Sequence, residues 1–445
     1  MRALVGKELR ELVASRSYWL LLIAAGVLTG QAFHEATSLY AEASGAGGGA
    51  SALAQGLNPL TGIVAPTLAA YDLVSTLLLP FVVIRLFASE RSTGSVLLML
   101  QAPVRFGVVI LAKACALLIG WLAVAIPGVL ALALWVRAGG HLYAPEVLTV
   151  AAGYLFRGVL TIGLGAAAGA LAESAASAAI IALSITIGSW AVDYAAAARG
   201  GLWSVVARYT PGAALRTFEH GELRVATMLV QTLLGITGLA IAAMWLRVGD
   251  SVRRRVGRSA VAAAAGLLLC AIAARSTQSW DTSEDRRNSF SAADEALLRR
   301  VPHPIWITAH LAAEDPRLAD LDRGVIAKLR RVLPDTKVAY VSQGRSGLFE
   351  RADPDYGEVW YNVAGRRVVS RSSTEEIVLD AIYEAAGLTP PATRDDRPYP
   401  GYPLRNTPAG GGLLFFCIWP LLVMVTWWVI RRPAIRTASF TVPRS

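Results

Sequence analysis

The sequence predicts a mainly α-helical polytopic membrane protein of about eight transmembrane helices, with one small extracytoplasmic α/β domain. The first reason is composition: 54% of the 445 residues are hydrophobic and only 17% are charged, whereas soluble proteins carry about 25% charged residues. The second reason is a series of eight apolar stretches that are separated by polar segments. The third is a single polar block, residues 276–408, which lies between the last two of these stretches.

Each apolar stretch approaches or reaches the roughly 17–25 residues that a hydrocarbon core demands. The weakest is 259–274, which is short but has no polar interruption, so a thin or compressed bilayer would accommodate it. The predicted spans are 18–38, 63–84, 107–135, 148–171, 176–197, 226–246, 259–274 and 411–430.

The distribution of basic residues predicts the orientation of these spans. Segments on one side carry 17 Lys and Arg and the opposite short loops carry six, and basic loops remain in the cytoplasm. Both termini are therefore expected inside a bacterial cytoplasmic (inner) membrane, with 276–408 outside. That block is nearly neutral, with 18 Lys and Arg against 20 Asp and Glu. The net charge of +10 is thus explained by loop charge, and no nucleic-acid partner is expected.

Periodicity within the polar block predicts a small α/β domain. Residues 305–311 alternate as a strand does, and 315–332 has helical spacing. A second strand is expected at 337–341. A hairpin at 358–370 turns at Ala364-Gly365, and a helix at 373–386 ends at Gly387. Residues 389–408, rich in Pro, Arg and Asp, are expected to form an extended linker to the last span.

Sequence patterns that carry catalysis are missing. The only Gly-Lys pair, Gly6-Lys7, lacks the upstream glycine of a phosphate-binding loop. The five histidines show no metal-ligand spacing, and the three cysteines lie far apart within apolar runs. We therefore expect no catalytic residue, metal or cofactor in this chain, which argues against a membrane enzyme.

Among the charged residues inside predicted spans, three aspartates and arginines stand out. Asp72 and Arg157 lie at similar depths in the second and fourth spans, so an ion pair between them is expected. Its role is either structural or that of a polar element in a transport path. Asp193 is near the outer end of the fifth span, where water can reach it. The small residues of 163–169 predict a close helix–helix contact, with a gate hinge as the alternative.

Three stretches of the first 250 residues share the pattern of a known family. One is the basic and acidic run before the first span, the second lies between spans two and three, and the third precedes span six. Together they resemble the permeases of type 2 ATP-binding-cassette (ABC) transporters of the gliding-motility type. They are Lys7-Glu8-Leu9-Arg10-Glu11-Leu12; Ala88-Ser89-Glu90-Arg91-Ser92-Thr93-Gly94-Ser95 with Leu98, Pro103-Val104-Arg105 and Lys113; and Pro211 to Gly221-Glu222-Leu223-Arg224.

The resemblance implies docking residues for a separate ATPase subunit, which would bind ATP and Mg. The family's coupling helix corresponds to Glu90, Arg91, Gly94, Pro103 and Arg105. Its amphipathic entry helix corresponds to Lys7, Glu8, Arg10 and Glu11. The mixture of charges and leucines in 89–105 is itself typical of a short helix that docks in a partner's groove. The alternative is an inert surface helix anchored by its arginines.

The start of the polar block has a second resemblance. Trp280-Asp281-Thr282-Ser283-Glu284-Asp285-Arg286-Arg287-Asn288-Ser289-Phe290-Ser291 resembles the opening of the gliding-motility auxiliary domain. In that family the domain lies outside the membrane between two helices. The chain is therefore similar to a six-span permease fused to a shortened auxiliary partner.

These observations divide the chain into a permease domain (1–250), a seventh helix with its basic lead-in (251–275), an α/β domain and linker (276–408) and an eighth helix with its tail (409–445). The expected function is that of the transmembrane subunit of an ABC transporter, which pairs with a second permease copy and an ATPase. The alternative is a non-transporting subunit that relays ATPase motion to an extracytoplasmic partner protein. Nothing in the sequence names a substrate or a direction of movement.

Overall fold

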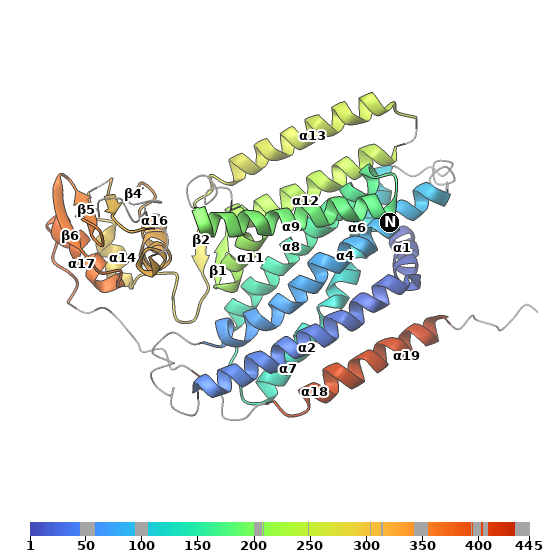
Figure 1. Cartoon of the computed structure of the whole chain (residues 1–445), viewed down its shortest axis with the longest axis horizontal. Helices are drawn as coiled ribbons and strands as arrows, with labels where there is room; N and C mark the ends of the chain where they lie inside the picture. Colours follow the sequence, from blue (N-terminus) through green and yellow to red (C-terminus); the bar gives the residue numbers. More distant parts are fainter. Residues whose placement is uncertain are drawn as a thin grey trace, which may run out of the picture.

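The computed structural model describes residues 1–44, 58–93, 106–199, 207, 209–247, 249–302, 304–312, 315–341, 355–392, 394, 402–403 and 408–431. Its description of side chains additionally leaves out 88–93, 106, 196–199 and 323. Within these ranges the chain forms a bundle of long helices and, at one end of that bundle, a small α/β unit (Figure 1).

Long apolar helices make this a membrane-embedded protein. Seven are long and apolar enough to cross a membrane, and an eighth span is obtained if α1 and α2, bent by 71°, are taken together. The bundle helices are α1 (Arg2–Ala14), α2 (Arg16–Ser44), α4 (Ala65–Thr93, preceded by the π-helical turn η1, Leu60–Val64), α6 (Phe106–Val124), α7 (Ile126–Arg137), α8 (Ala144–Leu171), α9 (Ala175–Arg199), α12 (Val225–Leu246), α13 (Val252–Ala273) and the final run α18 (Gly411–Leu413), η3 (Leu414–Ile418) and α19 (Trp419–Arg431).

Two predicted spans differ in detail from the observed helices. The span predicted at 107–135 is divided into α6 and α7 at Ala125, because Pro127 lacks the N–H that would continue the helix and instead occupies the first turn of a new one. The span predicted at 259–274 begins earlier, at Val252, so α13 is a single helix of 22 residues. Arginine is a good helix former, and its long side chain can reach polar surroundings from a span end.

Glycines bring α8 and α12 into close contact. A Cβ atom at Gly163 would lie 2.2 Å from the Gly235 carbonyl oxygen, and one at Gly238 would lie 2.4 Å from the Gly163 carbonyl oxygen. No side chain fits at these positions without moving a backbone. The close helix contact predicted around 163–169 is therefore confirmed for Gly163, and small residues set the distance between the two helices.

The last span, formed by η3 and α19, packs against α2. Gly26 and Gly30 of α2 leave room for Trp419 and Phe415, since a Cβ atom at either glycine would overlap these rings. Trp419 Nε1 also donates a hydrogen bond to the Leu22 carbonyl at 2.9 Å. Arg431, at the far end of α19, donates to the carbonyl of Ala14, which places this end of α19 beside the turn between α1 and α2.

The α/β unit has its own apolar core, which extends from Phe290 to Leu388. Four strands form a sheet in the order β4-β3-β5-β6, in which only β3 and β4 are parallel. The helices α14, α16 and α17 lie around this sheet (Figure 1). The strands and helices predicted between 305 and 386 are confirmed, as β3 (Trp306–Ala309), the run α15 (Pro316–Asp320), η2 (Leu321–Ile326) and α16 (Ala327–Val332), β4 (Lys337–Tyr340), β5 (Val359–Val363), β6 (Arg366–Ser370) and α17 (Glu375–Ala386). The helix α14 (Ala292–Leu298) was not predicted.

Local sequence explains the turns of this unit. Ala364 and Gly365 both have positive φ, at 51° and 85°, and they reverse the chain between β5 and β6 as the Ala-Gly pair predicted. Gly387 ends α17 in the left-handed conformation with φ 70°. Ser291 begins α14 by accepting a hydrogen bond from the Asp294 backbone N–H.

Candidate functional site

A buried ion pair joins three helices where the bundle begins. Lys113 Nζ, from α6, lies 2.7 Å from Glu8 Oε2 of α1, and both side chains are 1% exposed. The same ammonium group donates to the Leu86 carbonyl of α4 at 3.3 Å. It also lies 5.7 Å from the centre of the Phe87 ring. Removing one partner of such a pair costs roughly 3–5 kcal/mol, because the other charge is left buried and alone.

This pair fixes the helices on both sides of the predicted coupling segment. Leu86 precedes that segment in α4, and Lys113 follows it in the second turn of α6. Glu8 comes from the predicted entry helix, α1, in which Leu12 is buried as well. The pair therefore ties the entry helix to both ends of the chain segment that the sequence marks for docking.

The other predicted docking residues lie around this cluster or outside the described residues. Lys7 contacts Glu8 at 3.2 Å and Glu11 at 3.1 Å, and Arg10 is exposed. The helix α4 runs on to Thr93, so Glu90 and Arg91 lie in the last turns of this helix, beyond the end of its candidate membrane span at Phe87. Gly94, Pro103 and Arg105 lie outside the described residues.

The ion pair predicted inside the bundle is present. Arg157 Nε of α8 lies 3.2 Å from Asp72 Oδ1 of α4. Thr76, one helical turn after Asp72, donates to the same carboxylate at 3.1 Å, and Arg157 Nη2 donates to the Thr76 hydroxyl at 3.2 Å. The three side chains close a hydrogen-bonded triangle between the helices. This arrangement supplies each charge with a partner, as burial in a bilayer requires.

Two further carboxylates, Glu219 and Asp193, also have polar partners, and of these the sequence pointed only to Asp193. Tyr154 of α8 donates to Glu219 Oε1 at 2.8 Å. Glu219 ends α11 (Pro211–Glu219), a short helix that packs against α8. Burial raises the pKa of Glu219, although the hydrogen bond from Tyr154 opposes this shift. Asp193 is paired rather than simply wetted, since it accepts from Thr210 Oγ1 at 2.5 Å and lies 3.3 Å from Arg216 Nη2.

At the opposite end of the bundle, two of the four segments with a family resemblance pair with each other. The strand β1 (Glu222–Arg224) follows α11, and β2 (Ser279–Asp281) follows α13. They run antiparallel, with Glu222 opposite Asp281 and Leu223 opposite Trp280. The turn before β1 favours Gly221, whose φ of 78° is one that other residues rarely adopt, and a Cβ atom there would lie 3.1 Å from Ser283 Cβ. The permease-like part and the start of the polar block thus share one small sheet.

The residues after β2 are bound to the first turns of α8 by a network of hydrogen bonds, which we call the α8 joint. Its members are His141, Glu146, Thr149, Thr282, Glu284 and Arg287. Glu146 accepts from the Glu284 backbone N–H at 2.9 Å and from Arg287 Nη2 at 3.2 Å. The hydroxyls of Thr149 and Thr282 lie 2.8 Å apart. His141 Nε2 lies 2.9 Å from Glu284 Oε2.

Further groups hold the α8 joint in shape. Asp281 accepts hydrogen bonds from Ser283, Asn288 and Ser289. Burial alone would raise the pKa of Asp281, but these hydrogen bonds outweigh it and lower the pKa below 3.8. Tyr402, from the predicted linker, stacks on His141 and donates to Glu284 at 2.6 Å. That hydrogen bond, together with burial, raises the pKa of Tyr402 to about 12.

Sequence reasoning missed Lys113 as a buried charge and missed the α8 joint altogether. A signal for Lys113 was available, because it interrupts an otherwise apolar predicted span. The partners in the α8 joint are separated by more than a hundred residues, and no local pattern links them.

The described residues contain no group of three or more His, Cys, Asp and Glu that could hold a metal ion. Comparison of the chain with protein-family models, curated proteins and solved structures finds no match.

Proposed function

We propose that this chain is the transmembrane permease subunit of an ABC transporter complex in a bacterial inner membrane. A separate ATPase binds ATP and Mg, and a second permease copy, identical or related, completes the pathway. Both termini then face the cytoplasm, and residues 276–408 lie outside. The observation that carries the proposal is the buried contact of Lys113 with Glu8 and the Leu86 carbonyl.

The contact supports this function because it joins the helices on either side of the predicted docking segment. A subunit that converts ATPase closure into helix movement needs its docking segment attached firmly to the helices that move. Here the helices on both sides of 94–105 are bonded to each other and to α1 through one ammonium group. A push on this segment would be passed to α4 and α6 together.

The helix contacts offer a route from the docking end to the α8 joint. The helix α4 is bonded to α8 through Asp72 and Arg157. The helix α8 carries Glu146, which binds the chain just after β2. The N-terminus and the last described turn of α19 lie at the end of the bundle opposite to the α/β unit (Figure 1). This arrangement agrees with a docking end inside and an α/β unit outside.

The docking part of the proposal is tested by exchanging charges. The variant Glu90→Lys with Arg105→Glu, co-expressed with the proposed ATPase subunit, is expected to insert in the membrane but to lose co-purification of the ATPase. Asp250→Lys with Arg254→Glu is the matched control, because it exchanges an ion pair in the neighbouring α12–α13 turn. Equal recovery of the ATPase with both variants would contradict the proposed docking site.

The second candidate function is a relay that moves no solute and transmits ATPase-driven motion to an extracytoplasmic partner protein. The α8 joint favours it, because three hydrogen bonds attach the polar block to α8. Two more attach it to His141, just before α8, and to the Gly221 carbonyl, just before β1. Reconstitution with the ATPase in vesicles separates the two functions. ATP-dependent movement of a lipid or saccharide supports transport, whereas an ATP-dependent change in the α/β unit without such movement supports the relay.

A further inference from the structure

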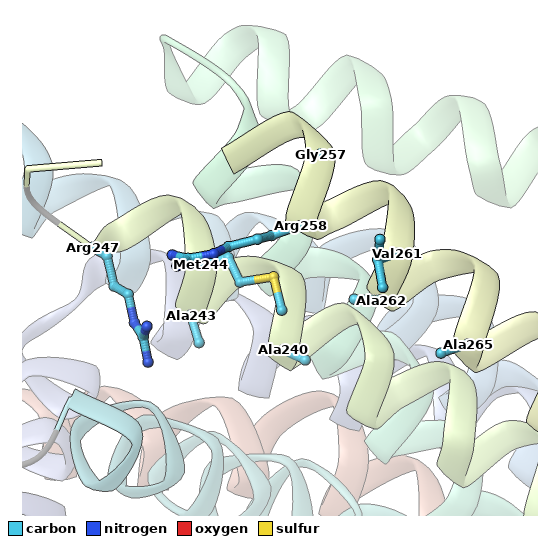
Figure 2. A pocket seen from close by; sticks show the side chains of 9 residues that line it. All are labelled: Ala240, Ala243, Met244, Arg247, Gly257, Arg258, Val261, Ala262 and Ala265. Atoms are coloured by element: carbon cyan, nitrogen blue, oxygen red, sulfur yellow. The ribbon is translucent and has the colours of Figure 1, made fainter. Parts of the chain in front are cut away.

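A groove between α12 and α13 has the features of a lipid site. Its cavity volume is about 690 Å³, within the range of roughly 300–1,000 Å³ that is usual for ligand sites. The floor and walls are small or apolar, including Ala240, Ala243 and Met244 from α12 and Ala262 from α13. Figure 2 shows these side chains between the two helices, with Arg247 and Arg258 at the same end of the groove.

The groove opens toward the lipid side of the bundle. The helix α13 packs mainly against α12, and Val261 and Leu267 on it are 70% and 64% exposed. The two helices are held together on either side of the groove. Trp245 Nε1 donates to Ser259 Oγ at 2.8 Å, and Gly266 lies against Thr237. The groove is therefore a fixed recess in a surface that faces acyl chains.

One end of the groove is rich in positive charge. The chain from 247 to 258 contains five arginines and one acidic residue, Asp250. Arg258 and Arg254 share Asp250, at 2.7 Å and 3.6 Å. Within the described part of the chain, Arg247 has no carboxylate partner. The local excess of positive charge is complementary to a phosphate group.

We propose that this groove binds one anionic phospholipid, with an acyl chain along Ala240, Ala243 and Ala262 and the phosphate between Arg247 and Arg258. Basic pockets between transmembrane helices are known to take anionic headgroups. The apolar part alone would accept any lipid, so the arginines make the site selective. This site is separate from the docking region and from the α8 joint.

The test measures lipid binding to the purified full-length chain in detergent by native mass spectrometry. Dioleoyl phosphatidylglycerol is titrated against dioleoyl phosphatidylcholine, and one phosphatidylglycerol is expected to remain bound in preference. Arg247→Gln with Arg258→Gln should weaken its binding by about thirtyfold, on the scale of two basic residues at a membrane surface. Arg137→Gln with Arg275→Gln is the matched control, because it removes the same charge from exposed arginines elsewhere and should leave binding unchanged.

A second variant keeps the test decisive if the arginine variant inserts poorly. Ala262→Trp fills the groove while both arginines remain, and it should displace the phosphatidylglycerol. Equal binding of phosphatidylcholine would overturn the proposal. So would an equal loss in the Arg137 and Arg275 control, or full binding in Ala262→Trp. Disulfide formation between copies carrying cysteines at Ala243 and Ala262, at the expense of lipid, would assign the groove to a second copy of the chain instead.

Discussion

Lys113 Nζ lies 2.7 Å from Glu8 Oε2, although 105 residues separate the two in the sequence. Both charged groups are removed from water, so each one lowers the free-energy cost of burying the other. The pair stands where the first helix of the chain meets the two helices that flank the predicted docking segment. Its placement links the energetics of folding to the proposed contact with an ATPase.

Replacing one member of this pair should be far more harmful than replacing both. Lys113→Met leaves the Glu8 carboxylate buried without a partner and should lower the free energy of unfolding by about 3–5 kcal/mol. Lys113→Met with Glu8→Leu puts apolar groups in the same volume and should recover most of that loss. Thermal unfolding of the detergent-solubilised chain measures both. Losses that simply add in the double variant would show that the two groups do not depend on each other.

The pair of Asp72 and Arg157 should behave as one unit under charge reversal. Asp72→Arg or Arg157→Asp alone places two like charges together in the bundle and should destabilise it by several kcal/mol. The exchange of both should recover part of the loss, with a coupling energy of about 0.5–3 kcal/mol. Membrane yield and thermal unfolding are the measurements. The ATPase rate of the complex then separates the two roles of the pair. If the pair is only structural, the double exchange restores the ATPase rate together with stability. If the pair also takes part in coupling, the ATPase rate stays low although stability is recovered.

The same substitution at two glycines should have opposite effects. Gly163→Ala places a Cβ atom against the Gly235 backbone and should cost about 1–3 kcal/mol. Gly188→Ala, in α9, meets nothing within 4 Å, and the better helix propensity of alanine should leave stability unchanged or raise it by up to about 1 kcal/mol. Chemical or thermal unfolding of the two variants side by side gives the comparison. Equal effects would mean that the close approach of α8 and α12 does not limit the side chain at Gly163.

The contribution of Asp281 should depend on pH only in acid. Because its pKa in the folded chain is lowered below 3.8, the ionised carboxylate stabilises the folded α8 joint. That contribution is complete above its ordinary pKa and is lost as the pH falls through the lowered one. Asp281→Asn should therefore melt at a lower temperature than the unchanged chain by a constant amount from pH 5 to pH 8. The difference should shrink below about pH 4, and a difference that varies across the neutral range would contradict this assignment.

The sequence predicted the helices well because burial in lipid leaves a strong and local pattern. The apolar run 226–246 became α12 almost residue for residue, and the hairpin predicted at 358–370 became β5 and β6. The boundaries shifted where one residue changes the backbone, as Pro127 does, or where arginines extend a helix beyond its apolar part, as in α13.

The candidate site was only partly predictable for a different reason. Asp72 and Arg157 could be paired because each was a lone charge at the same depth in a span. Glu8 was predicted only from its resemblance to an entry helix, and its partner Lys113 was counted among the loop charges. Glu146 and Glu284 meet only after α8 and the polar block have come together, so their pairing depends on the tertiary fold rather than on spacing.

The seating of Trp419 and Phe415 against Gly26 and Gly30 has a consequence for biosynthesis. Trp419 is synthesised 397 residues after Leu22, the α2 residue whose carbonyl it binds. During translation the notch at these glycines is open to lipid until Phe415 and Trp419 have been synthesised and inserted. A product cut short before residue 411 would keep that notch unfilled, so the quality-control proteases of the membrane would have a distinguishing mark by which to recognise unfinished copies.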